Sequence, residues 1–524
     1  MNNIFPVIDM FAGPGGLGEG FSAYTRNDDN SEFKIQLSIE KDIYAHKTLE
    51  LRSFFRQFPD GEIPPEYYNH IRGEIPRAKL FSFYPSQARS ASQESWLATL
   101  GEVAPEIVDK RIERALKGKK RWVLIGGPPC QAYSMIGRAR IGGIKEDDPR
   151  VFLYREYMRI LARHAPPVFV MENVKGLLSS RVKGSLIFEQ ILKDLQSPSS
   201  AFIKLKGKKK KYLHDVKYNI YSFVKEPEKD IFGIGEYQHQ DFVIHCEDYG
   251  IPQTRHRVIL LGIREDLRNV IANLLNKSPK HISVSQMLSS LPRLRSGLSR
   301  EYDSEENWLK KIRESLNQPW LSEVPHIAGH KVYEKIIQTV TNLRRIRKGR
   351  GNEYVYCRKK MTYMRDWFHD PELDGACNHT TKAHMTDDLY RYLYVSCFGK
   401  VHKRSPLLVE FPKSLLPNHR NAKKKLRWSN FADRFRVQLS ERPCCTITSH
   451  LSKDGHYYIH PDPSQCRSLT VREAARLQTF PDNYFFCGPR TQQYIQVGNA
   501  VPPLLAKQIA EIISDVIKSA FPGI

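Results

Sequence analysis

The sequence contains no long hydrophobic run and few cysteines. Nowhere does it approach the roughly 18 successive apolar residues that a membrane-spanning helix needs, and its first residues hold no basic segment followed by an apolar one. We therefore expect no secretory signal, no membrane partner and a cytoplasmic location, on the nucleoid if the source is bacterial. The nine cysteines include no Cys-x2-Cys spacing, so we expect neither a disulfide framework nor a metal site.

Acidic residues are fewer than basic residues. The 524 residues include 57 Asp and Glu against 81 Lys and Arg, which leaves a formal charge of +24. Because a net charge of about 2–8 already suffices for solubility, the excess indicates a polyanionic partner, most simply nucleic acid. The hydrophobic share of 40% excludes a disordered chain, and the length exceeds the roughly 300 residues that one core organises. At least two domains are expected.

Short apolar segments alternate with helical ones in the N-terminal half. This pattern is typical of a doubly wound α/β fold with a mostly parallel sheet, in which ligands bind beyond the carboxyl ends of the strands. The glycine-rich and polar motifs should then follow strands directly, and in the sequence they do. We expect strands at residues 7–9, 35–39, 122–125, 168–171, 242–245 and 258–263.

Other segments interrupt this rhythm. Residues 59–120 resemble an insertion between the second and third expected strands, and the lysine run at 206–211 is either a solvated loop or a phosphate contact. From 264 to 446 the alternation is lost, and basic residues lie among aromatic ones, which suits a nucleic-acid surface. Its aromatic residues are Tyr354, Tyr356, Tyr363, Trp367, Tyr390, Tyr392 and Tyr394. An apolar stripe at helical spacing (Leu505, Ile509, Ile512, Ile513 and Val516) predicts a final helix that packs back on the first sheet.

A glycine-rich turn follows the first expected strand. Its spacing, Gly13-x-Gly15-x-x-Gly18, together with Glu40 after the next strand, fits a nucleotide-binding turn in which the acid holds ribose hydroxyls. Taken alone it permits NAD, FAD or an adenosyl cofactor, or simply a tight turn. Phe11 beside the turn favours stacking on an adenine ring.

Cys130 follows the expected strand at 122–125, behind two prolines. A deprotonated thiol is a strong nucleophile, whereas the commoner role of a lone cysteine is inert packing. The next residues, 135–150, are rich in Gly and Arg and suit a loop that closes over a substrate. This context favours a presented, reactive thiol.

Charged side chains lie at the ends of two further strands. Glu172 ends the strand at 168–171, where it either serves chemistry or caps the following helix. Arg255 and Arg257, two residues apart, enter the strand at 258–263 and should point to one face, where they can hold a carboxylate and a phosphate together.

These motifs together resemble those of the DNA cytosine-5 methyltransferase family, of the bacterial restriction–modification type. The segments F-A-G-P-G-G (11–16), G-P-P-C-Q (127–131), E-N-V (172–174) and Q-T-R-H-R (253–257) are followed by two more. These are R-E-A-A-R-L-Q-T-F-P-D (472–482) and Q-V-G-N-A-V-P-P (496–503). All six occur in the family's order, with the long variable stretch before the fifth.

The resemblance implies a Rossmann-like S-adenosylmethionine-dependent catalytic domain at 1–264. A smaller target-recognition domain at 265–446 and a segment at 447–524 that returns to the catalytic domain complete the expected organisation. It implies catalytic roles for Cys130, Glu172, Arg255 and Arg257. The cofactor-binding residues implied are Phe11, Gly13, Gly15, Gly16, Leu17, Glu40, Pro128, Asn499 and Val501.

The implied reaction is methylation of carbon 5 of a flipped cytosine in double-stranded DNA, with S-adenosyl-L-methionine as cofactor and a covalent bond to Cys130. A cognate restriction endonuclease is an implied partner, and we expect a monomer because an asymmetric target needs no dimer. Three alternatives remain open: an RNA cytosine-5 methyltransferase, a nicotinamide-dependent oxidoreductase, and an inactive DNA-binding module on the same scaffold.

Overall fold

The computed structural model describes residues 4–26, 31–59, 61–128, 149–182, 185–206, 213–229, 235–267, 270, 272–357, 359, 361–417 and 432–521. The chain divides into two compact units. Unit 1 comprises Met1–Ile63, Phe81–Lys280 and Ala500–Ile524, and unit 2 comprises Pro64–Leu80 and His281–Asn499.

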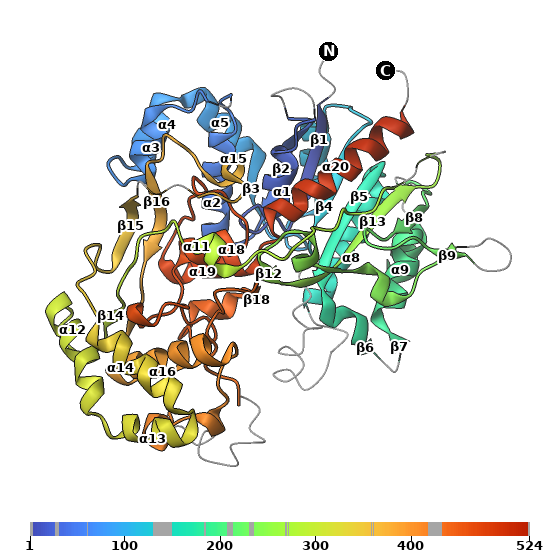
Figure 1. Cartoon of the computed structure of the whole chain (residues 1–524). Coiled ribbons are helices and arrows are strands. Elements are labelled where there is room, and N and C mark those ends of the chain that lie inside the picture. Colours follow the sequence, from blue (N-terminus) through green and yellow to red (C-terminus); the bar gives the residue numbers. More distant parts are fainter. Residues whose placement is uncertain are drawn as a thin grey trace. The chain divides into compact units, whose positions relative to one another are not determined.

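Unit 1 is built on an eight-stranded sheet (Figure 1). The strand order is β11-β13-β5-β4-β1-β2-β3, and β8 pairs with a further part of β13. All pairings from β5 to β3 are parallel, whereas β13 is antiparallel to β5, β8 and β11. The expected doubly wound, mostly parallel α/β fold is therefore confirmed. The strands are β1 (Phe5–Met10), β2 (Phe33–Glu40), β3 (Ser95–Leu97), β4 (Val123–Gly126), β5 (Val168–Val174), β8 (Tyr218–Tyr221), β11 (Val243–His245) and β13 (His256–Arg264).

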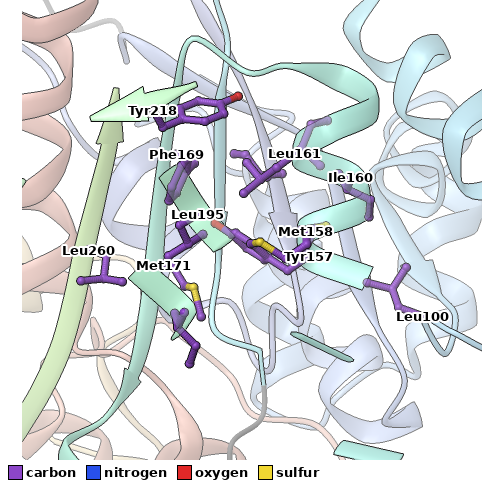
Figure 2. Close-up of a cluster of buried hydrophobic side chains, with 14 of the residues drawn as sticks. Leu100, Tyr157, Met158, Ile160, Leu161, Phe169, Met171, Leu195, Tyr218 and Leu260 are labelled. Carbon is purple, nitrogen blue, oxygen red and sulfur yellow. The ribbon is translucent and has the colours of Figure 1, made fainter. Parts of the chain in front are cut away.

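Helices cover this sheet and supply its core. Strand β1 is buried at every position, as expected of a parallel strand with cover on both faces. Figure 2 shows Tyr157, Met158 and Leu161 of α8 packed with Phe169 and Met171 of β5. The helices of unit 1 are α1 (Gly16–Ser22), α2 (Ile43–Phe55), α5 (Pro85–Glu94), α6 (Pro105–Leu116), α8 (Pro149–His164), α9 (Ile187–Gln196), α10 (Pro198–Lys206) and α20 (Pro503–Ala520).

The final helix, α20, packs against α1. Gly20 of α1 lies so close to α20 that an added Cβ would stand 2.5 Å from the Cβ of Ala506. The residues of the expected apolar stripe are buried along α20, with exposures between 0% and 5%. The last described helix therefore completes the fold that the first strand and helix begin.

The described residues of the expected insertion at 59–120 form a strand and helices. They hold β3, which pairs with β2, together with helices α5 and α6 in unit 1. The segment Pro64–Leu80 belongs to unit 2 instead. Each of α3 (Pro65–Ile71), α5 and α6 has a proline at its first turn, so these prolines start helices within the insertion.

Unit 2 is mainly helical, with a hairpin of β15 (Gly351–Tyr356) and β16 (Gly375–Thr380) and a short pair of β14 (Gly297–Leu298) and β17 (Ala383–His384). Its helices are α3 (Pro65–Ile71), most of α4 (Arg77–Phe83), α11 (Val284–Leu288), α12 (Glu305–Glu314), α13 (Pro319–Ile327), α14 (His330–Thr341), α15 (Arg365–Phe368), α16 (Thr386–His402), α18 (Val471–Leu477) and α19 (Arg490–Asn499).

Three of the tyrosines expected on a nucleic-acid surface lie in the core of unit 2. Tyr390, Tyr392 and Tyr394 are all on α16 and are 6%, 0% and 0% exposed. That expectation is wrong for these three, because α16 is buried along most of its length and its residues face the core all round. Tyr356 remains 41% exposed on β15.

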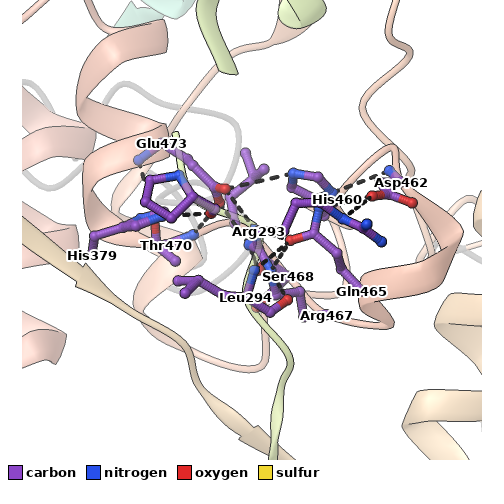
Figure 3. A network of polar contacts seen from close by, with 12 residues as sticks. Arg293, Leu294, His379, His460, Asp462, Gln465, Arg467, Ser468, Thr470 and Glu473 are labelled. Atoms are coloured by element: carbon purple, nitrogen blue, oxygen red, sulfur yellow. Dashed lines mark hydrogen bonds and ion pairs between the residues drawn. The ribbon is translucent and has the colours of Figure 1, made fainter. Parts of the chain in front are cut away.

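A buried polar network organises the end of unit 2 (Figure 3). Arg467 donates to both carboxylate oxygens of Glu473, at 2.7 and 2.6 Å, and both side chains are 1% exposed. Glu473 also accepts from the backbone N–H of Thr470, which caps α18. Burial raises the pKa of Glu473, but the charge and hydrogen bonds of Arg467 and the charge of His460 outweigh this and hold it well below the ordinary value.

Candidate active site at the carboxyl edge of the sheet

Four parallel strands and one antiparallel strand bring the predicted residues of unit 1 to one edge of the sheet. Strands β1, β2, β4 and β5 all end there, at Met10, Glu40, Gly126 and Val174. Strand β13 runs the opposite way, so its first residues lie at the same edge, with Arg257 opposite Val174. The motifs that follow the four strands and precede the fifth are neighbours for this reason.

The glycine-rich turn after β1 is held by Glu40. Gly13 has a φ of +57° and Gly15 a φ of +92°. The backbone N–H of Gly13 donates to Glu40 Oε2 at 2.8 Å. Phe11, at +56°, starts the turn in the same left-handed region. A Cβ on Gly13 would meet nothing within 4 Å, so the space beside this backbone is open.

Glu40 is nearly saturated with backbone donors. Besides Gly13 on Oε2, its Oε1 accepts from the N–H groups of Lys41 and Asp42, at 2.9 and 2.8 Å. A carboxylate offers about four lone-pair positions, so one remains for an outside hydroxyl. Burial raises the pKa of Glu40, against these three hydrogen bonds, which lower it. The geometry suits an acid that fixes the turn and keeps one acceptor position open.

The C-terminal segment lies against the same turn. Gly16 approaches the backbone of Val501 so closely that any Cβ there would overlap the carbonyl oxygen of Val501. Val501 is 6% exposed, and Leu17 is also 6% exposed, so the side chain of Leu17 belongs to the core. Asn499 is exposed at the end of α19 and belongs to unit 2.

Glu172 and Arg257 form an ion pair at the end of β5. Arg257 Nε lies 2.8 Å from Glu172 Oε1, and the two side chains are 12% and 14% exposed. A Cβ on Gly127 would lie 2.8 Å from Glu172 Oε2, so the glycine leaves room for the carboxylate beside the turn after β4. In that turn the carbonyl of buried Pro128 accepts a hydrogen bond from Asn173 at 3.4 Å.

Arg255 is buried near the same pair. It is 1% exposed, and its N–H donates to the carbonyl of Gln253 at 2.8 Å. These charged side chains affect the buried thiol of Cys246. Burial raises the pKa of this thiol to about 12. Arg255 and Arg257 lower the pKa, and Glu247 and Glu172 raise it further. All four charged side chains therefore act on one buried thiol.

Cys130 lies outside the described residues. So do residues 135–148 of the loop expected at 135–150, whose last two residues begin α8, and residues 207–211 of the lysine run at 206–211. The structure follows the chain from β4 as far as Pro128, two residues before this cysteine. Gly127 and Pro128, which precede this cysteine in the sequence, are thus placed, and Glu172 lies beside Gly127.

Sequence reasoning missed two residues at this edge. Asp9 ends the apolar run of β1 and is 1% exposed, and burial raises its pKa to about 8, against Arg56 and the backbone of Gly18, which lower it. The signal for it was a single acid in an otherwise apolar strand. Gly127 was read only as part of a motif, although its lack of a side chain is what admits Glu172.

Comparison with known proteins decides the family. A model of the C-5 cytosine-specific DNA methylase family matches residues 102–198 and 229–515. The chain belongs to this family. The methyltransferase is 31% identical over 538 residues to the type II methyltransferase M.Bpa9945I of Bacillus paralicheniformis, covering 98% of this chain and 99% of the relative. It is 25% identical over 430 residues to the DNA (cytosine-5-)-methyltransferase M.ApeKI of Aeropyrum pernix, covering 77% and 83%.

A solved structure agrees on the fold. A prophage-encoded protein of Escherichia coli, described as a candidate DNA modification methyltransferase, superposes with a TM-score of 0.51 at 17% identity, covering 98% of the methyltransferase and 99% of that chain. Family membership makes the protein an enzyme, a DNA (cytosine-5-)-methyltransferase, with DNA as its substrate. No helix within the described residues is long and apolar enough to cross a membrane.

Proposed function

We propose that this enzyme transfers the methyl group of S-adenosylmethionine to carbon 5 of a flipped cytosine at a specific site in duplex DNA, as the modification enzyme of a restriction–modification system. The observation that carries the proposal is the Glu172–Arg257 ion pair beside the turn that leads from β4 to Cys130. The names of its relatives, type II methyltransferases, support the biological role.

The glycine-rich turn fits an adenosyl cofactor. Gly13 borders open space, Glu40 keeps one acceptor position for a ribose hydroxyl, and Phe11 stands at the start of the turn for the adenine. S-Adenosylmethionine supplies an electrophilic methyl group when bound. We assign its binding to Phe11, Gly13, Gly15, Gly16, Leu17, Glu40, Pro128, Asn499 and Val501, with Leu17 contributing through its backbone because its side chain is in the core.

Cys130 activates the cytosine. Carbon 5 of cytosine is a poor nucleophile, and addition of the Cys130 thiolate to carbon 6 turns the ring into an enamine that pushes electron density onto carbon 5. After carbon 5 takes the methyl group, loss of its proton and departure of the thiolate restore the aromatic ring. Because the target atom is inaccessible within the duplex stack, the base must leave it at a cost of a few kcal/mol.

Glu172 and the two arginines hold the ring during this addition. Arg257 occupies Oε1 of Glu172, which leaves Oε2, on the side of Gly127, for the amino group and ring nitrogen 3 of cytosine. Sharing a proton with nitrogen 3 offsets the negative charge that the thiolate brings into the ring. Arg255 and Arg257 add positive charge at the same place.

We assign recognition of the DNA site to residues 265–446 and a return to the catalytic domain to residues 447–524. The longer stretch of unit 2 runs from His281 to Asn499, so it includes most of the proposed recognition region and also residues 447–499 of the proposed returning segment. The enzyme is proposed to act as a monomer, with a cognate restriction endonuclease as its genetic partner.

Two assays test the function. Methylation-sensitive sequencing of DNA from cells that express the enzyme should show 5-methylcytosine at one short motif and at no other site. Transfer of a tritiated methyl group should favour duplex DNA that contains this motif over transfer RNA. Preference for transfer RNA would reverse the substrate assignment in favour of an RNA methyltransferase, and NADH turnover would favour an oxidoreductase.

The covalent step has its own prediction. Cys130→Ser should bind duplex DNA as the wild type does but lose methyl transfer by a factor of about 10⁴ or more, because the weakly acidic hydroxyl cannot replace the thiolate. Duplex DNA with 5-fluorocytosine at the target should give a denaturant-resistant adduct, mapped by mass spectrometry to Cys130. The control is Cys246→Ser, which should still form the adduct, since the Cys246 thiol is buried with its pKa raised to about 12. An adduct on another cysteine contradicts the assignment.

A further inference from the structure

Two histidines and a glutamate form a cluster at the edge of the sheet in unit 1. His245 ends β11 and His256 begins β13, and the antiparallel register places them directly opposite each other. Glu247 follows in the short 3-10 helix at Cys246–Tyr249. One ligand atom from each of the three side chains lies within 4.8 Å of the other two. Nothing in the proposed methyl transfer uses these residues.

The ligand atoms are partly arranged already. His256 Nε2 and Glu247 Oε1 are hydrogen-bonded at 2.9 Å. The rings of His245 and His256 are stacked with centroids 4.0 Å apart and planes 11° from parallel. Zinc binds imidazole nitrogen at about 2.0–2.1 Å and carboxylate oxygen at about 2.0–2.2 Å, so two tetrahedral ligand atoms stand roughly 3.3 Å apart. His256 and Glu247 need to separate only slightly to admit an ion.

The third ligand can move to meet the ion. His245 is exposed, and its side chain makes no hydrogen bond or ion pair with any residue that the structure describes. Rotation about its side-chain bonds can therefore tilt its ring out of the stack and direct a nitrogen at the shared point. Glu247, 13% exposed, holds Oε2 buried without a hydrogen-bond partner among the described residues. A buried carboxylate oxygen in this state is stabilised by a cation.

An ion at this site would change the hydrogen bonding of His256. Neutral imidazole is the form that binds a metal. An ion at His256 Nε2 would replace the hydrogen bond to Glu247, with the proton of His256 then carried on Nδ1.

We propose that His245, Glu247 and His256 bind a divalent transition metal, with zinc as its natural occupant and water in the fourth position. Two imidazoles and one carboxylate match the N and O ligands of zinc, whereas calcium and magnesium take sites built of oxygen alone. The ion would join β11, the 3-10 helix and β13, and so fix the start of the strand that carries Arg257. A search of the sequence for paired cysteines does not detect this arrangement, because its ligands are histidines brought together by strand pairing.

Equilibrium dialysis of the full chain, without an affinity tag, tests the proposal. The wild type should bind one equivalent of zinc, and its melting temperature should rise with zinc concentration. Loss of a residue that only orients a metal ligand weakens metal binding by roughly 10–100-fold. His245→Asn and Glu247→Gln each remove a ligand itself, so each should weaken zinc binding by at least this much. His245 is exposed, so its variant tests the site without disturbing the core. His326→Ala, an exposed histidine on α13, is the matched control and should bind zinc as the wild type does.

Cobalt distinguishes this site from a thiol site. The cobalt-loaded Cys130→Ser protein should show the visible bands of a nitrogen and oxygen site, with no sulfur-to-cobalt charge-transfer band. Absence of saturable zinc binding by the wild type would overturn the proposal. Equal binding by His245→Asn and Glu247→Gln, or a charge-transfer band from sulfur, would overturn it as well. None of these readouts depends on methyl transfer.

Discussion

At the scale of single residues, the two acids at the carboxyl edge of the sheet are held by different contacts. Glu172 is fixed by one ion pair to Arg257 and by the space that Gly127 leaves, whereas Glu40 is fixed by three backbone N–H groups. Glu172 thus keeps an oxygen for a substrate, and Glu40 serves mainly the shape of the turn. The two acids should respond differently to substitution.

Glu172→Gln should lower the rate of methyl transfer by about 10²–10⁴-fold with DNA affinity nearly unchanged, because the amide keeps the size of the side chain but cannot share a proton with the cytosine ring. Single-turnover kinetics with tritiated cofactor and a separate DNA-binding measurement check this. Glu265→Gln, an exposed glutamate of unit 1, is the control and should act like the wild type. A Glu172→Gln enzyme with normal turnover would remove this residue from the chemistry.

Asp9→Asn tests the buried acid of β1. The pKa of Asp9 is about 8 in the folded chain against an ordinary value of 3.8, so the folded state holds a proton that the unfolded state has lost between these pH values. Wild-type stability should therefore fall as pH rises from about 4 to about 8, by on the order of a few kcal/mol. The variant cannot titrate there, so its urea-unfolding curve should depend less on pH. Parallel pH profiles for the two proteins would contradict the assignment.

The sequence alone located most residues of the candidate site, but not the neighbouring residues Asp9 and Gly127. Glu172, Arg255 and Arg257 were found because each flanks an apolar strand, and the strand ends of a parallel sheet coincide in space. The role of Gly127 depends on a close approach between two strands, which no local pattern encodes, whereas Asp9 could have been noticed as the one acid in an apolar strand. For Cys130 the sequence and the family remain the basis of the assignment.

At the scale of elements, the packing of α1 on α20 depends on glycine. Gly16 and Gly20 lie four residues apart on one face of α1, and both approach backbone atoms of the C-terminal segment. Residues four apart face the same way on a helix, so together they form a shallow groove. The groove receives the first turn of α20.

Gly20→Ala should destabilise the enzyme. Alanine favours a helix by about 1 kcal/mol over glycine, but its Cβ would stand 2.5 Å from Ala506 Cβ and from Lys507 N, and overpacking of this kind costs about 1–3 kcal/mol or more. Urea unfolding should show a net loss. Glu511→Ala, on the exposed side of α20, should change stability by less than about 0.5 kcal/mol. A Gly20→Ala protein as stable as the control would show that the two helices do not pack this closely.

Elements were predictable where one physical signal dominated. The strands of unit 1 are apolar because both faces are covered, and α20 shows a clear helical stripe. For the insertion at 59–120 the sequence did not predict the secondary structure, because proline occurs both in loops and in the first turn of helices. The tyrosines of α16 were misassigned because tyrosine occurs both in protein cores and on surfaces that bind nucleic-acid bases. Only their burial in the structure distinguishes the two.

At the scale of the whole molecule, the charge of +24 leads us to expect basic surfaces that bind DNA. Arg344, Arg347 and Lys348 of unit 2 are exposed, and neither arginine is paired with an acid within the described residues. Lys348 lies 5.7 Å from the ring of exposed Tyr356. Arg345 is already paired with Glu305 and Glu306. We expect these exposed cations to contact DNA phosphates.

DNA binding should therefore weaken steeply with salt. If about 6–10 phosphates are neutralised, the logarithm of the binding constant should fall with the logarithm of salt concentration at a slope of roughly −5 to −9. Replacing Arg344, Arg347 and Lys348 together by alanine should make the slope shallower by about 3 and weaken specific and unrelated duplexes alike. Replacing Lys110, Lys119 and Lys120 of unit 1, also exposed, removes the same charge and should change the slope less. Equal effects of the two triple variants would contradict a phosphate-binding role for the unit 2 cluster.

The groove on α1 also bears on how the protein is made. The ribosome releases α1 (Gly16–Ser22) long before α20 (Pro503–Ala520), so the groove stays uncovered while the residues between them are made. Unit 1 cannot complete its fold until α20 is made, and a nascent chain that stops before Pro503 lacks the helix that packs on α1. A polypeptide truncated there should therefore aggregate and leave its DNA target unmethylated.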